Sequence, residues 1–291
     1  NMENFRPQLT LYAYNILGSY EDAKDIVQDV FLKYSEIDER SVDNPKSYLI
    51  RMVVNLAIDR KRRMKKEVKD YPGPWLPEPI STEDPQLSVH RKQILSYSML
   101  VLLEKLNSRQ RAVFILKEAF DYDHDEIGRV LGISADNSRK ILSRAKNELR
   151  SDLNVRPDEN QLEVLKRYLR VLESGDMDSL EQLLSEDVRA ASDGGGKAPA
   201  SRKILRGLQQ VGAFVTGLFK KTYFQTRYEI AIVNHQPAVL VYHEGAVVTC
   251  QIFSIRDSRI ESIYFMRNPD KMKRLRKISQ NDVTFSPPYS S

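Results

Sequence analysis

Apolar residues recur at helical spacing through the first part of the chain. In the segment 20–36 they fall on one face while acidic groups fall on the other, which predicts an amphipathic helix; the apolar positions are Ala23, Ile26, Val27, Val30, Phe31 and Tyr34. The same spacing before it, ended by Gly18, predicts a preceding helix, and Pro45 stands where a third helix begins. Residues 1–69 are therefore predicted to form one helical domain.

Residues 70–87 break this pattern. Five prolines and one glycine between positions 70 and 86 exclude a helix interior, so the segment must run extended as a linker. Trp75, the only tryptophan of the chain, and Leu76 lie inside it. Because a flexible linker rarely carries two large apolar side chains, we expect the stretch WLPEP, residues 75–79, to dock against another part of the chain.

Residues 88–155 are helical again and carry one strong motif. Ile127, Val130 and Leu131 give one helix its inner face, Gly132 turns the chain, and Ser134 caps a second helix. This pattern is typical of a helix-turn-helix, although a plain helical hairpin with a charged face has the same spacing. The second helix presents mainly amide, hydroxyl and cationic groups outward, which suit base edges and phosphates; they are Asp136, Asn137, Arg139, Lys140, Ser143, Arg144 and Lys146.

Beyond Pro157 the pattern changes to helices followed by strands. Helices are predicted over 161–173, 178–184 and 208–220, and β-branched and aromatic residues predict strands over 224–233, 238–243, 246–255 and 259–266. Gly245 and the pair Asp257-Ser258 mark tight turns between strands. We therefore expect an α+β cone or half-barrel over residues 160–277, followed by a disordered tail over 278–291.

The bulk composition is that of a globular protein, with 41% hydrophobic and 29% charged residues. The chain lacks the run of about eighteen apolar residues that a membrane span needs, and its start lacks the pattern of a secretory signal, so we expect a cytosolic protein with no membrane partner. A single cysteine, Cys250, excludes a disulfide framework and a thiolate-rich zinc site. The four histidines show no metal spacing, and we expect no cofactor.

The net charge of +5 is less informative than its distribution. Residues 60–66 read RKRRMKK and end the third predicted helix. A face that carries an amide and then several cations can hold an unstacked base and the phosphates beside it, although such a run is often only a solvated helix face. Steps of three and four residues place five side chains on that face: Asn55, Asp59, Arg62, Arg63 and Lys66.

Three of these motifs occur in the order and at the spacing of a known family. The stretches DAKDIVQDVFLK, NPKSYLIRMVVNLAIDRKRR and LNSRQRAVFILKEAFDYDHDEIGRVLGISADNSRKILSRAKNEL resemble regions two and four of the extracytoplasmic-function sigma factors, the promoter-specificity subunits of bacterial RNA polymerase. The resemblance covers about the first 150 residues. It implies two all-α sigma domains, region two over 1–69 and region four over 88–155.

The resemblance also implies partners. RNA polymerase core would be bound through the clamp of its largest subunit and through its flap region, and the clamp-facing row would be Asp25, Gln28, Asp29 and Lys33, which otherwise is a solvated helix face. The basic helix would read the minus-ten promoter element and the helix-turn-helix the minus-thirty-five element. Residues 39–44 would form the loop that receives a flipped base. Tyr48 stands where relatives often have tryptophan, so its ring either stacks on a base or packs in the fold.

Three short motifs narrow the resemblance to one group of these sigma factors, which carries a fused C-terminal SnoaL-like domain with the fold of nuclear transport factor two. They are WLPEP, DGGGK at 193–197, and NPDKM at 268–272, where relatives usually end in leucine. In that group the extension is thought to regulate the sigma core in place of a separate anti-sigma protein, so we expect no such protein. The implied regulatory residues are Trp75, Leu76, Pro77, Glu78, Pro79, Asp193, Gly194, Gly195, Gly196, Lys197, Asn268, Pro269, Asp270 and Lys271.

The DGGGK stretch by itself suggests a phosphate cradle, but it lacks the spacing of a Walker loop, so we interpret it as a contact loop. Two alternatives to regulation in cis stay open. The C-terminal domain could be an enzyme, with His235, His243, Glu244 and Asp193 as candidates for acid–base chemistry; we expect that it is not. It could also sense a small molecule, because the cone of this fold commonly holds a pocket and the predicted strands are rich in aromatic residues.

Overall fold

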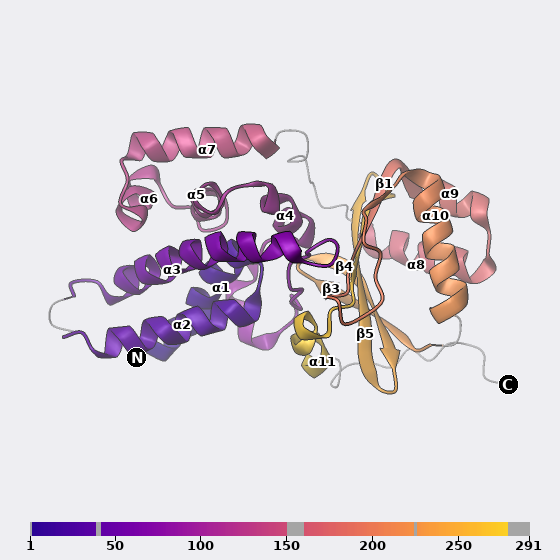
Figure 1. Ribbon diagram of the computed structural model, residues 1–291, viewed down its shortest axis with the longest axis horizontal. Coiled ribbons are helices and arrows are strands. Elements are labelled where there is room, and N and C mark those ends of the chain that lie inside the picture. Colours follow the sequence, from indigo (N-terminus) through magenta and orange to yellow (C-terminus); the bar gives the residue numbers. More distant parts are fainter. Residues whose placement is uncertain (1, 39–41, 150–159, 224–225, 279–291) are drawn as a thin grey trace. The chain divides into compact units, whose positions relative to one another are not determined.

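The computed structural model describes residues 2–38, 42–149, 160–223 and 226–278 (Figure 1). The chain divides into two compact units. The first consists of residues 1–70 and 84–154, and the second of residues 71–83 and 155–291. Most of the proline-rich segment therefore groups with the C-terminal part of the chain and not with the helices that flank it in sequence.

The first unit is helical throughout its described part. Its α-helices are α1 (Arg6–Leu17), α2 (Tyr20–Ser35), α3 (Pro45–Glu67), α4 (Tyr97–Leu102), α5 (Ser108–Glu118), α6 (His124–Leu131) and α7 (Ala135–Leu149). Short 3-10 turns are η1 (Met2–Phe5), η3 (Val68–Asp70), η4 (Pro85–Gln93) and η5 (Leu103–Lys105).

Local sequence sets the ends of these helices. Ser19 accepts a hydrogen bond from the Asp22 amide at the start of α2, and Asn44 does the same for the Ser47 amide at the start of α3. Gly18 ends α1 in the left-handed conformation, which glycine adopts without strain. All six apolar positions predicted for the inner face of α2 are buried. Around them, α1, α2 and α3 pack against one another.

The second unit is a mixed α/β domain. Its sheet has the order β2-β1-β6-β5-β4-β3, with β1 (Leu184–Asp193), β2 (Leu205–Arg206), β3 (Tyr228–Val233), β4 (Gln236–His243), β5 (Ala246–Arg256) and β6 (Arg259–Met266). Strands β3 to β6 form an antiparallel meander, whereas β1 runs parallel to β6. The turns of the meander have positive φ at both central residues, namely Asn234-His235, Glu244-Gly245 and Asp257-Ser258, as two-residue hairpin turns require.

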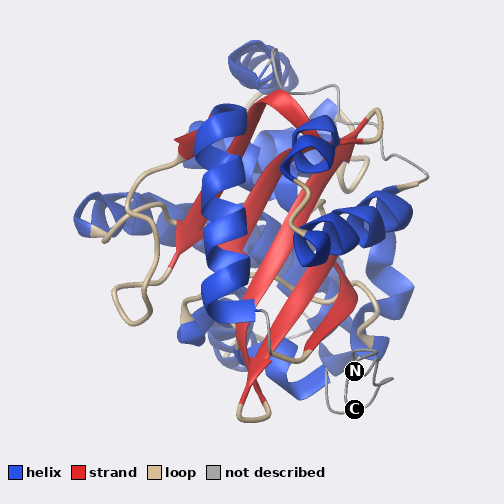
Figure 2. Ribbon diagram, turned by 90° about the vertical axis from the view of Figure 1, so that its right-hand side faces the viewer, coloured by secondary structure: helices blue, strands red, loops and turns tan. Residues whose placement is uncertain are grey.

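Three helices cover one face of this sheet: α8 (Gln161–Ser174), α9 (Met177–Leu183) and α10 (Gly207–Leu218). Figure 2 shows them laid across the strands. The space between helices and sheet is filled with apolar side chains, among them Tyr168, Phe253 and Phe265. The remaining elements are a π-helical turn, η6 (Phe219–Tyr223), the 3-10 turn η7 (Pro269–Lys271) and α11 (Lys273–Ile278).

Most of the predicted elements are present, and one prediction was incomplete. The four predicted strands correspond to β3 to β6; β3 begins at Tyr228, and residues 224–225 of the predicted strand lie outside the described residues. The sequence interpretation contained no strand between the short helix and the DGGGK stretch, where the structure has β1. Residues 279–291 of the predicted tail and residues 39–41 of the predicted base-receiving loop lie outside the described residues.

Candidate functional site

The predicted polymerase-binding face is a row of exposed side chains on α2. Asp25, Gln28, Asp29 and Lys33 are all exposed, while the apolar residues between them face the helical core. The Gln28 side chain accepts a hydrogen bond from Arg6 at 3.3 Å. Leu32 lies within the same row and is 57% exposed, so the face also offers an apolar side chain that the sequence interpretation did not include.

The basic run at the end of α3 contains both exposed side chains, which lie on the predicted minus-ten face, and a buried lysine. Asp59, Arg62, Arg63 and Lys66 are exposed. The Arg62 guanidinium lies 3.4 Å from the Asp59 carboxylate, and both side chains are more than half exposed, so this ion pair leaves the arginine available to solvent. The Tyr48 ring is 37% exposed, and its centroid lies 6.0 Å from that of the buried Tyr34.

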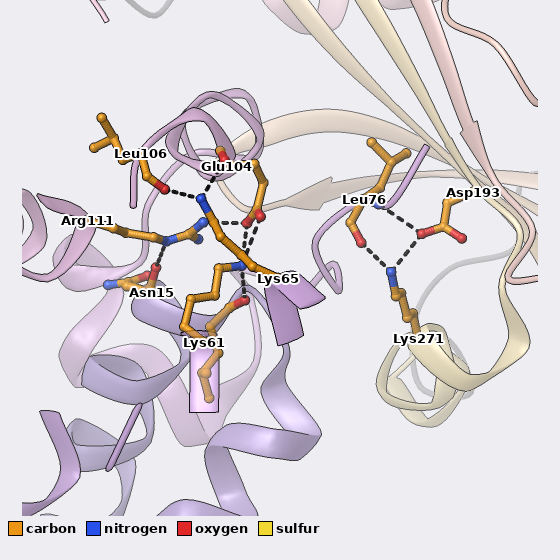
Figure 3. A network of polar contacts seen from close by, with 10 residues as sticks. Asn15, Lys61, Lys65, Leu76, Glu104, Leu106, Arg111, Asp193 and Lys271 are labelled. Atoms are coloured by element: carbon orange, nitrogen blue, oxygen red, sulfur yellow. Dashed lines mark hydrogen bonds and ion pairs between the residues drawn. The ribbon is translucent and has the colours of Figure 1, made fainter. Parts of the chain in front are cut away.

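Lys61, from the same basic run, points the other way. Its ammonium group donates to the Leu17 carbonyl at 2.8 Å and lies 2.8 Å from the Glu104 carboxylate, and the side chain is 2% exposed. The fully buried Arg111 also pairs with Glu104 (Figure 3). Burial, with Arg111 nearby, lowers the pKa of Lys61 to about 7, although Glu104 opposes the shift.

This largely buried ion cluster joins the helices predicted to form region two to those predicted to form region four. Lys61 belongs to α3, whereas Glu104 and Arg111 belong to η5 and α5. Lys65 adds a hydrogen bond to the Leu106 carbonyl. Burial alone would raise the pKa of Glu104, but Arg111 and Lys61 outweigh it and hold that pKa below its usual value. The carboxylate therefore stays ionised at neutral pH.

Three further contacts extend the same interface. The Tyr12 ring stacks on Phe120 with centroids 3.7 Å apart. The Asn15 amide donates to the Gln93 carbonyl at 2.7 Å. At the other end of α3, the Asn55 amide donates to the Val130 carbonyl of α6 at 3.0 Å. Asn55, a predicted base-reading residue, is thus occupied by region four in this arrangement.

The helix-turn-helix is formed by α6 and α7. Gly132 has φ +65°, and the Ser134 hydroxyl accepts from the Asn137 amide at 3.2 Å at the start of α7. A Cβ on Gly128 would lie 2.6 Å from the Ile133 carbonyl, so only glycine allows the turn to approach α6 this closely. The sequence interpretation did not identify Gly128. Every predicted recognition residue is exposed on the outer face of α7: Asp136, Asn137, Arg139, Lys140, Ser143, Arg144 and Lys146.

The three short motifs meet in the second unit around the Asp193 carboxylate, whose side chain is fully buried. One carboxylate oxygen accepts from the Tyr71 hydroxyl at 2.5 Å and from the Gly195 amide at 3.0 Å. The other accepts from the Leu76 amide at 2.9 Å and from the Lys271 ammonium at 2.7 Å (Figure 3). Asp193 therefore holds the linker, its own loop and the NPDKM motif together.

The glycines of DGGGK are required by close contacts. A Cβ on Gly194 would lie 2.1 Å from the Ala198 carbonyl, and one on Gly195 would lie 2.3 Å from the Asn268 side chain. Gly196, at φ +71°, would bring a Cβ to 3.1 Å from Pro72 of the linker. The next residue, Lys197, pairs with the Asp270 carboxylate, and Pro269 begins η7. The loop thus touches the NPDKM motif and the linker through backbone that leaves little room for side chains.

Lys271 is the cation of this cluster. Its ammonium group donates to the Leu76 carbonyl at 2.6 Å and lies 4.0 Å from the centre of the Trp75 ring. The centre of the Tyr71 ring is 5.1 Å away. Burial, reinforced by the hydrogen bond to Asp193, raises the pKa of Tyr71, so its hydroxyl stays protonated and remains a donor.

The rest of the linker binds the meander. Leu76, Pro77, Glu78, Pro79 and Ile80 are all buried. The Ile80 amide donates to the Asn234 side chain at 2.9 Å, and the Thr82 amide donates to the Ile232 carbonyl at 3.1 Å. Residues 80–82 therefore add a short bridge to β3, which lies at the edge of the sheet. The linker is attached at both of its ends to the same domain.

The four candidates for acid–base catalysis do not form one site. His235 and Glu244 stand in hairpin turns at φ +61° and +49°. The His243 side chain is 68% exposed, and Asp193 is occupied by its four donors. The His243 imidazole lies 4.0 Å from the Glu244 carboxylate, but both side chains are mostly exposed, at 68% and 87%.

Comparison with known proteins identifies the family. Residues 2–67 match the family model described as Sigma-70 region 2, and residues 97–149 match Sigma-70, region 4. The chain is 31% identical over 287 residues to the ECF RNA polymerase sigma factor SigJ of Mycobacterium tuberculosis, covering 92% of this chain and 91% of that one. The chain belongs to the extracytoplasmic-function sigma factors.

Two further matches agree. The crystal structure of SigJ superposes with a TM-score of 0.76 at 28% identity, covering 94% of this chain and 97% of that chain. The probable ECF RNA polymerase sigma factor SigI of the same species is 25% identical over 280 residues, covering 93% of each chain. The predicted fold class is confirmed as far as two helical sigma domains followed by a mixed α/β domain.

As a sigma factor, the protein directs RNA polymerase core to promoter DNA. Sigma factors as a class are not enzymes, and the C-terminal domain is an extension of the sigma core. The expectation that no separate anti-sigma protein acts on this chain has no support from these comparisons. Among the described residues, no helix is long and apolar enough to cross a membrane.

Proposed function

We propose that the C-terminal domain regulates this sigma factor in cis by holding the linker between regions two and four. The docked linker is the closed, low-activity state, and its release gives the polymerase-competent state. The observation that carries the proposal is the Asp193 carboxylate, which binds Tyr71 and Leu76 of the linker together with Lys271 of the C-terminal motif. In this proposal the domain itself performs no catalysis, and no separate anti-sigma protein is needed.

The distance between promoter elements explains why the linker matters. The names of the minus-ten and minus-thirty-five elements place them ~25 base pairs apart, or about 85 Å along B-DNA. A free segment of the length of residues 71–83 could span roughly 45 Å when extended. Because the docked segment is bound at both ends to one domain, its end-to-end distance is constant. Release of the linker therefore allows the distance between the two DNA-reading domains to vary, up to the full extension of the segment.

The contacts within the helical unit support the same reading. Asn55 on the proposed minus-ten face donates to the Val130 carbonyl of region four, so it must leave that partner before it can bind a base. Lys61 and Glu104 pair across the same interface. Promoter reading by both regions therefore requires the interface to open, and a docked linker favours the closed arrangement.

Full-length protein with core RNA polymerase tests the regulatory part. Asp193→Asn keeps the size of the side chain but removes its charge, and we expect it to raise promoter-directed transcription. Asp178→Asn, the same change at an exposed position of α9, is the matched control and should leave transcription unchanged. Transcription by the Asp193 variant equal to that of the wild type would refute regulation through the linker.

The DNA-reading assignments are tested separately. A promoter footprint with Arg139→Ala and Lys140→Ala should lose protection of the minus-thirty-five element, because both side chains are exposed on the recognition helix. Arg129→Ala removes an exposed cation from α6, outside the recognition helix, and serves as the control. Unchanged protection with the first two variants would rule out the proposed role of α7.

A further inference from the structure

The surroundings of the Lys271 ammonium group are those of a receptor for organic cations. Two aromatic rings face it, from Trp75 at 4.0 Å and Tyr71 at 5.1 Å. The Asp193 carboxylate lies 2.7 Å away and the Leu76 carbonyl 2.6 Å away. Aromatic faces combined with a carboxylate are the groups by which proteins recognise alkylammonium ligands.

These groups are held in place without the lysine. The Tyr71 hydroxyl is bound by Asp193 at 2.5 Å and by the Asn268 amide at 3.0 Å. The Leu76 amide is bound by Asp193 at 2.9 Å, so the carbonyl of the same residue is also positioned. Removal of the lysine side chain would leave these three contacts intact, so Tyr71, Leu76 and Asp193 would keep their positions.

The cage also requires a cation. The Asp193 side chain is fully buried, and an ionised carboxylate in that position without a counter-charge is strongly unfavourable. Lys271 and Trp75 are only partly buried, so one side of the cage is open to solvent. A soluble ammonium ion can therefore reach the place that the lysine occupies.

We propose that Tyr71, Trp75, Leu76 and Asp193 form a binding site for organic ammonium ions, that Lys271 is its built-in occupant, and that a free primary alkylammonium ion competes with Lys271 for the cage. Lys271 acts as a tethered ligand whose effective concentration is on the order of millimolar or above. A free ligand must exceed that concentration in the wild-type protein but has no competitor once the lysine is shortened. Binding does not depend on the proposed regulatory role; only its effect on transcription rests on that function.

The test uses full-length Lys271→Ala and n-butylammonium chloride, whose four carbons and ammonium group match the whole lysine side chain. Trp75 is the only tryptophan of the chain, so intrinsic tryptophan fluorescence reports on the cage directly. We expect a saturable change in the tryptophan fluorescence of the variant. Its half-maximal n-butylammonium concentration should be at least about tenfold lower than that of the wild type. Sodium chloride at equal ionic strength and the uncharged n-butanol are the controls and should give no saturable change.

A second variant separates the site from a general salt effect. Lys271→Met keeps most of the aliphatic stem, so it fills the cage without a charge and should not respond to n-butylammonium. Should Lys271→Ala be unstable, the ligand is expected to raise its unfolding midpoint in proportion to site occupancy, and sodium chloride is not. A fluorescence response indistinguishable from the n-butanol and salt controls, with no such stabilisation, would overturn the proposal.

Transcription assays distinguish this proposal from the regulatory one. Saturable binding to Lys271→Ala without any effect of n-butylammonium on transcription would keep the cation site and refute the regulatory role of the linker. Absence of binding, together with higher transcription by Asp193→Asn, would refute the cation site and keep the regulatory role.

Discussion

Replacement of Asp193 by alanine is the sharpest perturbation of the linker. The carboxylate is fully buried and accepts four hydrogen bonds, one of them from the Lys271 ammonium. Breaking a buried ion pair by removing one partner typically costs about 3–5 kcal/mol. The Lys271 side chain is 13% exposed and can turn toward water, which favours the lower end of that range. The Leu76 amide, left without its acceptor, adds about 1–3 kcal/mol.

These two effects overlap because they share one carboxylate. We therefore expect the free energy that favours the docked linker over the open state to fall by about 3–4 kcal/mol. Each 1.36 kcal/mol corresponds to a factor of ten, so the linker should open 10²- to 10³-fold more often, as an order of magnitude. Native-state hydrogen exchange of the Leu76 amide measures this opening, because that amide is protected only by Asp193 in the docked linker.

The control is Lys197→Ala, which removes the exposed ion pair with Asp270 at the edge of the same loop. Both side chains are about half exposed, and pairs of this kind contribute about 0–1 kcal/mol, so exchange at Leu76 should change less than tenfold. If the Leu76 amide of Asp193→Ala exchanged as slowly as that of the control, the reasoning that the carboxylate holds the linker would be wrong.

Three further predictions follow from single positions. Gly195→Val should raise linker exchange and alter transcription while the C-terminal domain stays folded by circular dichroism, because a Cβ there would lie 2.3 Å from the Asn268 side chain; wild-type transcription by this variant would contradict us. Gly128→Ala should destabilise the helix-turn-helix by about 1–3 kcal/mol in urea unfolding, because its Cβ would lie 2.6 Å from the Ile133 carbonyl; an unchanged midpoint would refute this. The pKa of Glu104 is depressed in the folded protein, so the unfolded chain binds more protons and the carboxylate contributes stability that is lost as the pH falls below its ordinary value near 4.5. Glu104→Gln should therefore flatten the loss of stability between pH 5 and 3, and an equal slope in both proteins would count against the ion cluster.

The helical spacing of apolar residues predicted the helical domains well, because the buried positions of each helix repeat within its own sequence. On α2 the buried positions follow steps of three and four residues, and the structure buries all of them. The same rule also contained the signal for Lys61, which continues the apolar row of Ala57 and Ile58 by one turn. Its burial was not predicted because RKRRMKK contains six cationic residues, and nothing in the run distinguishes Lys61 from the other five.

Strand β1 could not be predicted in the same way. Its sequence, LSEDVRAASD, lacks the alternation of a half-buried strand, and its burial becomes continuous only over the last residues. Its partner is β6, which is parallel to it and lies more than sixty residues further along the chain. Such pairing depends on tertiary contacts and leaves no periodic signal. The position of Asp193 at the end of this strand is what brings DGGGK next to NPDKM.

The interface between regions two and four and the docked linker are held together by different kinds of contact. The interface between regions two and four combines apolar contacts, such as the Tyr12 ring on Phe120, with an ion cluster in which Lys61 and Arg111 are buried and Glu104 is 25% exposed, and a buried ion pair contributes little net stability. The docked linker buries Leu76 and Ile80, which are 2% and 0% exposed, and exposing each to water costs about 1.5–3 kcal/mol. In the proposed mechanism these two side chains alone therefore contribute about 3–6 kcal/mol to docking of the linker on the C-terminal domain. In the proposed mechanism a signal that disturbs only the ion cluster leaves the linker bound to the C-terminal domain, so we expect the signal to act on the linker contacts around Asp193.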